Sequence, residues 1–486
     1  MDKAIDKLQP QQVWKNFYSL TQIPRPSGSE ERIEKFVLEF GKNLGLESFI
    51  DEVGNVIIRK PATPGMENRK GIVLQGHLDM VPQKNSDKVH DFVTDPIEAY
   101  IDGEWVTANG TTLGADNGMG VAAAMAILES TTIKHGPIEA LFTSDEETGM
   151  TGAEGLKAGL LKGDILLNLD SEDEGELYVG CAGGTNVNVS WKYNETPSGL
   201  VTSGFKLSLT GLKGGHSGLE IILQRGNSNI LMNRFLYYAT EKFGLQLSHI
   251  DGGSLRNAIP RESFAVVSVP TQYKAEFEAA VKEYETLYRK ELASVEPDLK
   301  FVCEEVAAPG SVIEQKTVDT LMRAIYACPN GVIRMSDDMP GLVETSTNLA
   351  SVKLVDGEIR IQCLLRSSVE TAQDDLGIAM KSLFELAGAK VELTGKYPGW
   401  KPNMNSAILN TMQGVYQNLY GKIPEIKAIH AGLECGLLGG VYTNWDMISF
   451  GPTIRYPHSP DEKVHIASVE KFWNYLVATV ENAPVK

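Results

Sequence analysis

The sequence predicts an α/β protein in which a discontinuous domain with a mostly parallel sheet and helices is interrupted by an inserted α+β domain. Two observations predict this fold class. Short apolar runs alternate with helical segments over residues 1–187 and again over 396–486, which is typical of a parallel sheet covered by helices. Between them, residues 188–395 contain strands that alternate apolar and polar residues. A chain of 486 residues is also too long for one typical domain.

The first segment begins with a helical pattern over residues 11–45, which is broken at 23–28. Further along, a helix of small residues is expected at 119–128. Short continuous apolar runs predict buried parallel strands, and they occupy residues 71–76, 138–143 and 164–169. This order of strands and helices supports a layered α/β domain.

The inserted segment changes to alternating strands at 205–209 and 264–269, with a hairpin signal at Asp356-Gly357. Helical patterns occupy 227–243 and 274–294. After residue 396 the chain returns to α/β character, with expected elements at 405–420 (helix), 446–450 (strand) and 467–482 (helix).

Composition excludes several functional classes. The net charge of −18, with no basic cluster, argues against a nucleic acid or an anionic membrane as partner. The five cysteines are widely spread and form no CxxC pair, which fits a reducing compartment. No signal-peptide core and no apolar run of roughly 20 residues is present. We therefore expect a cytoplasmic protein.

The stretch from Gly71 to Pro82 places an apolar run before two polar side chains, His77 and Asp79. Side chains two positions apart in an extended chain project to the same side, and ligands gather at the carboxyl ends of parallel strands. An imidazole that binds a metal ion, with a carboxylate that orients the ring, fits this spacing. A surface-exposed strand end fits it as well, so this stretch alone leaves both interpretations open.

Further potential metal ligands follow the later strands or occupy a glycine-flanked turn: Asp116, Glu146, Glu147, Asp170 and His458. Two histidines and three carboxylates suit a pair of borderline divalent ions, with Zn²⁺ the default and Co²⁺ or Mn²⁺ also possible. A two-ion site needs a ligand that bridges both ions, and a carboxylate can do this. Asp116 is the candidate bridge, because the neighbouring glycines allow the backbone to approach closely.

Glu146 and Glu147 are adjacent like charges, an arrangement that costs energy unless a cation compensates. In a turn both side chains can face one site, where one binds metal and the other acts as a base toward water. An ordinary acidic loop beside Asp145 is the alternative. Their position at a strand end favours the site.

Three residues outside this group suit contacts with a bound molecule. His216 lies between glycines in a loop of the insert, far in sequence from the other ligands, which favours a substrate contact over a metal bond. Arg366 follows a strand and suits a carboxylate, although a surface ion pair is the common role there. Glu434 lies among small and apolar residues, where it can bind an ammonium group or be structural.

Seven motifs, in this order, resemble the di-zinc aminopeptidase/dipeptidase family that includes carnosinases and aminoacylases: HLDMVP, GTTLGADNG, TSDEETG, NLDSEDEGELYVG, GLKGGHSG, HAGLECG and GPTIRYPHSPDE. The resemblance runs nearly end to end, and within the family it is strongest to bacterial enzymes that hydrolyse Xaa-His dipeptides.

The resemblance implies a role for each candidate. His77 and Asp170 would hold one ion and Glu147 and His458 the other, with Asp116 bridging them. It also implies a cis peptide bond after that bridging residue.

The remaining roles concern catalysis and substrate. The resemblance implies that Asp79 orients His77 and that Glu146 is the general base, and later the acid that protonates the leaving amine. His216 would polarise the scissile carbonyl, in this family often from a partner subunit. The substrate carboxylate and ammonium would meet the following residues: Arg366 and Asn257 for the carboxylate, Glu434 for the ammonium.

The function that the resemblance implies is metal-dependent hydrolysis of dipeptides with a free N-terminus, including β-Ala-His, by a homodimer whose insert is both a lid and the dimer contact. Two alternatives stay open: an N-acyl amino-acid deacylase with the same two-metal site, and a non-catalytic peptide-binding protein of the same fold.

Overall fold

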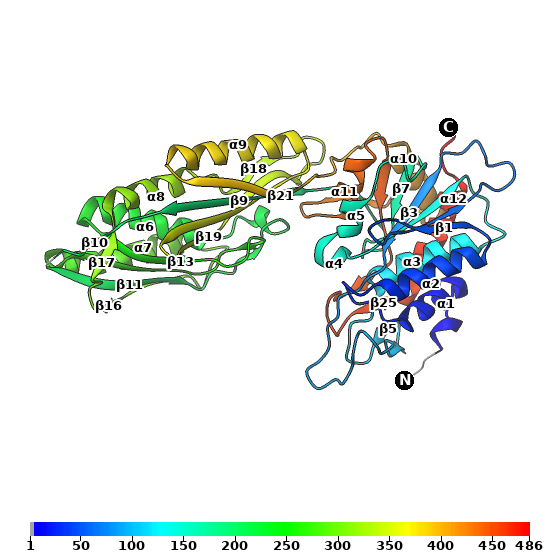
Figure 1. Ribbon diagram of the computed structural model, residues 1–486, viewed down its shortest axis with the longest axis horizontal. Helices are drawn as coiled ribbons and strands as arrows, with labels where there is room; N and C mark the ends of the chain where they lie inside the picture. Colours follow the sequence, from blue (N-terminus) through cyan, green and yellow to red (C-terminus); the bar gives the residue numbers. More distant parts are fainter. Residues whose placement is uncertain (1–3, 200) are drawn as a thin grey trace. The chain divides into compact units, whose positions relative to one another are not determined.

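The computed structural model describes residues 4–199 and 201–486, and its chain divides into two compact units (Figure 1). The first unit comprises Met1–Cys181, Pro402–Ala428 and Leu433–Lys486, and the second comprises Ala182–Lys401 and Ile429–Gly432. The boundaries predicted from the sequence, 187/188 and 395/396, lie a few residues from these. The short return of 429–432 to the second unit was not anticipated. That the second unit is a lid stays a prediction.

An eight-stranded sheet forms the centre of the first unit, in the order β1-β2-β6-β3-β7-β23-β8-β22. The four central strands β6, β3, β7 and β23 run parallel to one another, while β1, β2 and β8 pair antiparallel. The predicted fold class is therefore confirmed. The strands span the following residues: β1 Glu47–Ile50, β2 Val56–Lys60, β3 Ile72–His77, β6 Ile138–Thr143, β7 Ile165–Asn168, β8 Glu176–Cys181, β22 Glu425–Ile429 and β23 Asp446–Ser449.

The register of the central strands brings polar side chains to one edge. Ile72, Val73 and Leu74 are fully buried because the sheet is covered on both faces, and this explains the continuous apolar run of β3. His77 at the end of β3 lies opposite Thr143 at the end of β6, and β7 ends beside them. The loops that follow these three strands therefore begin side by side.

Helices cover this sheet. In α3 nearly every residue is buried, and its alanines and glycines let it pack closely on β3 and beside α1 (Figure 1). No helix within the described residues 4–199 and 201–486 is long and apolar enough to cross a membrane. The helices of this unit are α1 Gln11–Thr21, α2 Glu31–Asn43, α3 Ala115–Glu129, α4 Glu146–Gly149, α5 Thr151–Gly155, α10 Ala407–Tyr420, α11 Glu434–Val441 and α12 Ile466–Glu481, with the short 3₁₀ turn η1 Ile5–Lys7.

A small four-stranded sheet positions His458. Its order is β24-β25-β5-β4, and His458 lies in the turn between β24 and β25. The sequence predicts that His458 follows the strand at 446–450, whereas a further short strand, β24, intervenes. The strands are β4 Ala99–Asp102, β5 Trp105–Ala108, β24 Ile454–Arg455 and β25 Lys463–His465.

The second unit is an antiparallel sheet with helices packed against it, so the predicted α+β character is confirmed. Val187, Val189 and Trp191 on β9 are buried while their neighbours in sequence are more exposed, which is the pattern of a strand with one covered face. Its nine strands are β9 Gly183–Lys192, β11 Thr202–Thr210, β13 Gln246–Gly252, β15 Ser263–Pro270, β16 Lys300–Val306, β18 Gly331–Met335, β19 Val343–Val355, β20 Glu358–Ser367 and β21 Lys390–Tyr397.

Helices α6 to α9 complete the core of this unit. Two small two-stranded sheets, β12-β14 and β10-β17, lie outside the main sheet. The remaining elements are α6 Ser228–Phe243, α7 Lys274–Glu291, α8 Gln315–Ala327, α9 Glu370–Leu386, β10 Glu195–Pro197, β12 Gly215–His216, β14 Ala258–Ile259 and β17 Ser311–Ile313, with the 3₁₀ turns η2 Ile221–Leu223 and η3 Thr271–Tyr273.

Replacing two helical glycines of the first unit by alanine should change the stability of the protein in opposite directions. A Cβ at Gly120 in α3 would lie 2.4 Å from the carbonyl oxygen of Leu169, whereas a Cβ at Gly414 in α10 would meet nothing within 4 Å. We expect Gly120→Ala to lower the free energy of unfolding by about 1–3 kcal/mol and Gly414→Ala to raise it by about 0.5–1 kcal/mol. Urea denaturation of both variants checks this, and equal effects would contradict it.

Candidate functional site

His77 and Asp170 meet at the edge where β3 and β7 end. Nε2 of His77 lies 3.2 Å from Oδ1 of Asp116 and 3.4 Å from Oδ1 of Asp170. On its other side, Nδ1 of His77 lies 3.3 Å from Oδ1 of Asp79. The ring therefore has one nitrogen toward two carboxylates and the other toward Asp79, which is the arrangement of a metal-binding histidine with an orienting carboxylate.

A second group forms on the other oxygen of Asp116. Nε2 of His458 lies 3.2 Å from Oδ2 of Asp116 and 3.0 Å from Oε2 of Glu147. Asp116 lies where α3 begins, and its backbone and that of Asn117 are not helical. The peptide bond between these two residues is cis, as the resemblance implies.

The residues present fit two divalent ions. The potential ligand atoms of His77, Asp116 and Asp170 lie within 4.8 Å of one another, and so do those of Asp116, Glu147 and His458. Oε1 of Glu147 and Oδ1 of Asp170 are buried, and neither has a hydrogen-bond partner within the described part of the chain. Because Asp116 contributes one oxygen to each group, it can bridge two ions. The structure thus brings together all five predicted ligands, and their binding of ions stays a prediction.

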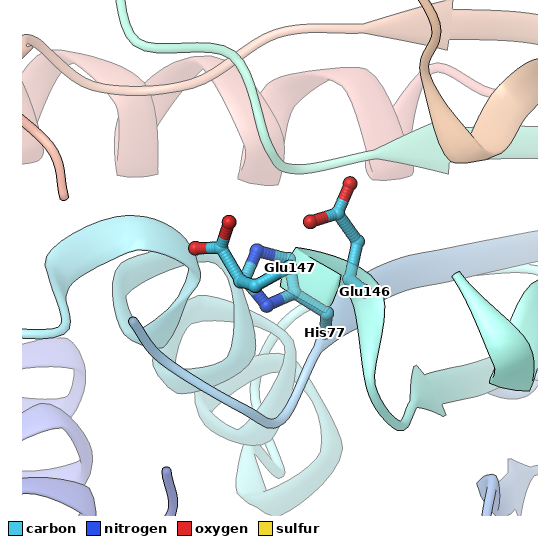
Figure 2. Close-up of side chains that lie close together, drawn as sticks. All are labelled: His77, Glu146 and Glu147. Atoms are coloured by element: carbon cyan, nitrogen blue, oxygen red, sulfur yellow. The ribbon is translucent and has the colours of Figure 1, made fainter. Parts of the chain in front are cut away.

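Glu146 lies outside the two groups that share Asp116, although with His77 and Glu147 it forms a third group of potential ligand atoms within 4.8 Å of one another. Figure 2 shows its carboxylate and that of Glu147 pointing to the same side of the chain near His77. The two residues open the short helix α4, after Asp145 with a φ of 55°. Oδ1 and Oδ2 of Asp79 accept the N–H groups of Glu146 (3.0 Å) and Glu147 (3.2 Å). Asp79 therefore positions this segment as well as His77.

The cluster shifts the pKa values of its members. Burial alone lowers the pKa of His77, but the neighbouring carboxylates, chiefly Asp170, outweigh it and raise this pKa well above its ordinary value. Hydrogen bonds to Asp116 and Glu147 raise the pKa of His458 to about 11. Burial raises the pKa of Asp170 to about 7. Without a metal ion, both imidazoles therefore hold protons at neutral pH.

Glu146 also has a perturbed pKa. Burial raises the pKa of its carboxyl well above the ordinary value, and the charges of Asp170 and Glu434 add to this, although His77 opposes them. A carboxylate whose pKa is raised in this way is a stronger base than an ordinary glutamate, which suits it to take up a proton.

Glu434, at the start of α11, belongs to a buried polar network in the same unit. Its Oε2 accepts Nε2–H of Gln75 (2.6 Å) and Oγ1–H of Thr143 (2.9 Å), while Oε1 is buried and has no hydrogen-bond partner among the residues described. Oε1 of Gln75 in turn accepts Nδ2–H of Asn168 (2.5 Å). Burial raises the pKa of Glu434 to about 7. Donors from two strands, β3 and β6, thus hold Oε2 of Glu434, while its Oε1 has no hydrogen-bond partner among the described residues.

The second unit contains His216, on β12. Its Nδ1 accepts the N–H groups of Gly218 (3.2 Å) and Leu219 (3.0 Å). A neutral ring in this position therefore carries its proton on Nε2, which becomes a hydrogen-bond donor. Burial and the charge of Arg366 lower the pKa of His216, so the ring is neutral at pH 7.

Arg366 and Asn257 lie in the same region of the second unit. The carbonyl of Asn257 accepts the N–H of Ser217, next to His216. Arg366 is buried at the end of β20, where Nη1 donates to the hydroxyl of Tyr397 (3.2 Å) and Nε has no hydrogen-bond partner in the part of the chain that is described. His430 lies in this unit too, with Nε2 2.8 Å from Oγ of Ser346. Burial, with the charge of Arg366, lowers the pKa of His430 to about 3, so it is neutral as well.

Comparison with known proteins identifies the family. Residues 73–482 match the peptidase family M20/M25/M40. The chain belongs to this peptidase family. The cytosol non-specific dipeptidase of Escherichia coli is 48% identical over 484 residues, which are 99% of each chain.

Solved structures agree with this assignment. The aminoacylhistidine dipeptidase of Vibrio alginolyticus superimposes with a TM-score of 0.96 at 48% identity, covering 99% of this chain and 98% of that one. The aminopeptidase PepT of Bacillus cereus, at 18% identity and a TM-score of 0.62 over 98% of this chain and 99% of that one, shares the fold. The predicted class of enzyme, a metallopeptidase, is confirmed.

Three buried residues of this M20 peptidase were missed from the sequence. Arg25, Asn117 and Glu462 touch the segments that carry the predicted ligands. Nδ2–H of Asn117 donates to the carbonyl of Leu169 (2.7 Å), which ties the Asp116 turn to the segment of Asp170. Arg25 lies within the helix break at 23–28, and Glu462 is the last residue of the motif GPTIRYPHSPDE. Neither signal indicates what a charged side chain there would bind.

Binding of Zn²⁺ to the metal-free M20 peptidase should release protons at pH 7. The pKa of His77 is raised well above its ordinary value and that of His458 to about 11, so both rings must lose a proton before they can bind an ion. We expect the affinity for Zn²⁺ to rise with pH between 6 and 8. Calorimetric titrations in two buffers with different ionisation enthalpies measure the release. Identical heats in both buffers would contradict the prediction.

Proposed function

We propose that this M20 peptidase is a two-metal dipeptidase, with Zn²⁺ as its ion, that cleaves dipeptides with a free N-terminus. The observation that carries the proposal is the pair of ligand groups sharing Asp116, with the carboxylate of Glu146 outside these two groups but within 4.8 Å of ligand atoms of His77 and Glu147. Xaa-His dipeptides, including β-Ala-His, would be among its substrates, with broader dipeptide activity.

The full-length relatives support this choice over a deacylase. One is named a non-specific dipeptidase and the other an aminoacylhistidine dipeptidase, and each is 48% identical to this chain. The first name favours broad activity and the second favours a C-terminal histidine. The name of the first relative also supports a location in the cytoplasm.

The residues of the first unit would perform the hydrolysis. Bound divalent ions polarise a carbonyl and lower the pKa of water. His77, Asp116, Glu147, Asp170 and His458 would hold these ions. Glu146 would take a proton from the attacking water and then deliver it to the nitrogen of the leaving amine. Its raised pKa supports proton uptake, because a carboxylate with a higher pKa is a stronger base than an ordinary glutamate.

Glu434 would bind the α-ammonium group of the substrate. Two donors already satisfy its Oε2, whereas its buried Oε1 has no partner among the described residues. An ammonium group would supply that partner together with a compensating charge. An acylated amino group has no positive charge and could not replace it.

The second unit would recognise the rest of the substrate. The buried guanidinium of Arg366 would bind the C-terminal carboxylate together with Asn257, and Nε2–H of His216 would donate to the scissile carbonyl. The unit would act as a lid and as the contact of a homodimer. Charged recognition at both ends favours dipeptides, because a longer chain would leave one charged group without a partner.

Replacing Glu146 should separate catalysis from metal binding. We expect Glu146→Gln to lower kcat by about 10²–10⁴-fold, since the amide cannot accept a proton. The metal content measured by atomic absorption should stay at two ions per chain. Glu154→Gln, which changes an exposed glutamate of α5, is the matched control and should keep full activity. An active Glu146→Gln variant would rule out the assigned base.

Replacing Glu434 should distinguish a dipeptidase from a deacylase. We expect Glu434→Gln to lower kcat/KM for dipeptides such as β-Ala-His by about tenfold to a hundredfold, because hydrogen bonds to charged groups contribute about 1.5–3 kcal/mol. Hydrolysis of N-acetyl-histidine should be slow in both proteins. A wild-type protein that prefers the acetylated substrate, or a variant with unchanged dipeptide activity, would contradict the proposal.

A further inference from the structure

Glu462 is a buried carboxylate whose hydrogen bonds all go to one short backbone segment. Its Oε2 accepts the N–H groups of Leu113 (2.7 Å) and Gly114 (2.9 Å), and its Oε1 accepts those of Ala115 (2.7 Å) and Asp116 (3.2 Å). The side chain is only 1% exposed. Four consecutive donors on one carboxylate hold this backbone in a single conformation.

Glu462 also belongs to the segment that carries His458. Its own backbone N–H donates to the carbonyl of Ser459 (3.0 Å), and its carbonyl accepts Oγ1–H of Thr107 (2.7 Å). The segment is therefore fixed to the small sheet on one side and to the turn of Asp116 on the other. These two segments carry Asp116 and His458, two of the three members of the second ligand group.

Arg25 holds the same turn from another direction. Its Nη1 donates to the carbonyls of Leu78 (2.8 Å) and Asp79 (2.9 Å), and its Nη2 donates to the carbonyl of Gly114. A Cβ at Gly114 would lie 2.6 Å from that Nη2, and one at Gly118 would lie 2.7 Å from it. The glycines of this motif therefore make room for the guanidinium. Arg25 joins the segment after His77 to the turn of Asp116.

These contacts oppose the electrostatic repulsion among the carboxylates of the cluster. The carboxylates of Asp116, Glu147 and Asp170 repel one another, so a flexible turn would move Asp116 away from the others whenever no cation holds it. Neither Glu462 nor Arg25 contacts the ligand oxygens. Glu462 and Arg25 bond to backbone groups of the turn. The two carboxylate oxygens of Asp116 therefore remain directed toward His77 and His458.

We propose that Glu462, supported by Arg25, is a positioning residue that fixes the bridging carboxylate of Asp116 in the binding conformation before metal ions bind. This inference rests on the proposed two-metal site. It assigns to the buried carboxylate a role in metal affinity in addition to its role in stability.

The first test is Glu462→Gln. The amide has one oxygen, and its NH₂ group would face two of the four N–H donors. We expect the dissociation constant for Zn²⁺, measured at 25 °C against a chromophoric chelator, to rise about 10–100-fold, as for other groups that orient metal ligands. Asp461→Asn, which alters the exposed neighbouring carboxylate, should leave it unchanged. Circular dichroism verifies that each variant is folded.

Three outcomes are separable. A folded Glu462→Gln protein with a lower Tm but a Zn²⁺ constant within twofold of the wild type would overturn the inference, since a purely structural role predicts that result. A wild-type protein that binds fewer than two Zn²⁺ ions would instead overturn the proposed function. If Glu462→Gln does not fold, Glu462→Asp and Arg25→Lys provide the same measurement, with a smaller expected rise.

The second test needs no variant. Hydrogen–deuterium exchange of the metal-free wild-type protein reads the amides of residues 113–116 directly. We expect them to be protected from exchange before Zn²⁺ is added, with less than a twofold further slowing afterwards. Amides that exchange freely in the metal-free protein and become protected only with Zn²⁺ would show that the ions, and not Glu462, fix the turn.

Discussion

The repulsion among buried carboxylates is the constraint on which the first unit depends. Asp79, Asp116, Glu146, Glu147 and Asp170 gather around His77, and burial makes each charge more costly. The structure compensates with backbone N–H groups. Asp79 accepts those of Glu146 and Glu147, and Glu462 accepts those of the turn that carries Asp116. The carboxylates of Asp79 and Glu462 thus fix the backbone segments that carry Glu146, Glu147 and Asp116.

This arrangement explains the unusual backbone at the site. Gly114, Asp145 and His458 all have positive φ values, which cost energy for residues other than glycine. Each lies where the chain must turn sharply after an element so that a side chain can reach the common centre. The parallel sheet brings the ends of its strands to one edge, and the turns that follow direct the side chains toward the common centre. Local backbone geometry that would be unfavourable elsewhere is maintained by the bonds around it.

The sequence predicts the strands, and it predicts which polar side chains gather at their ends, because both leave local signals. A strand buried on both faces is a continuous apolar run, and a polar side chain directly after it stands out, as His77 does after β3. Arg25 and Glu462 leave no such signal. Their partners are backbone groups 89 and 349 residues away in sequence, and backbone groups have no residue type to recognise. The return of 429–432 to the second unit also depends on contacts with residues far away in sequence, so it leaves no local signal either.

Each unit buries a charged group that has no partner of opposite charge among the described residues. Near the cluster of the first unit, Glu434 leaves one buried oxygen without a partner among the described residues. In the second unit the buried Arg366 forms no ion pair with any described residue, and its neighbours His216 and His430 have lowered pKa values and stay neutral. An unpaired anion and an unpaired cation are each costly when buried. A dipeptide carries a free ammonium group, which would supply the missing partner of Glu434. An acylated amino acid has no ammonium group to pair with Glu434, which is the physical reason to favour a dipeptidase.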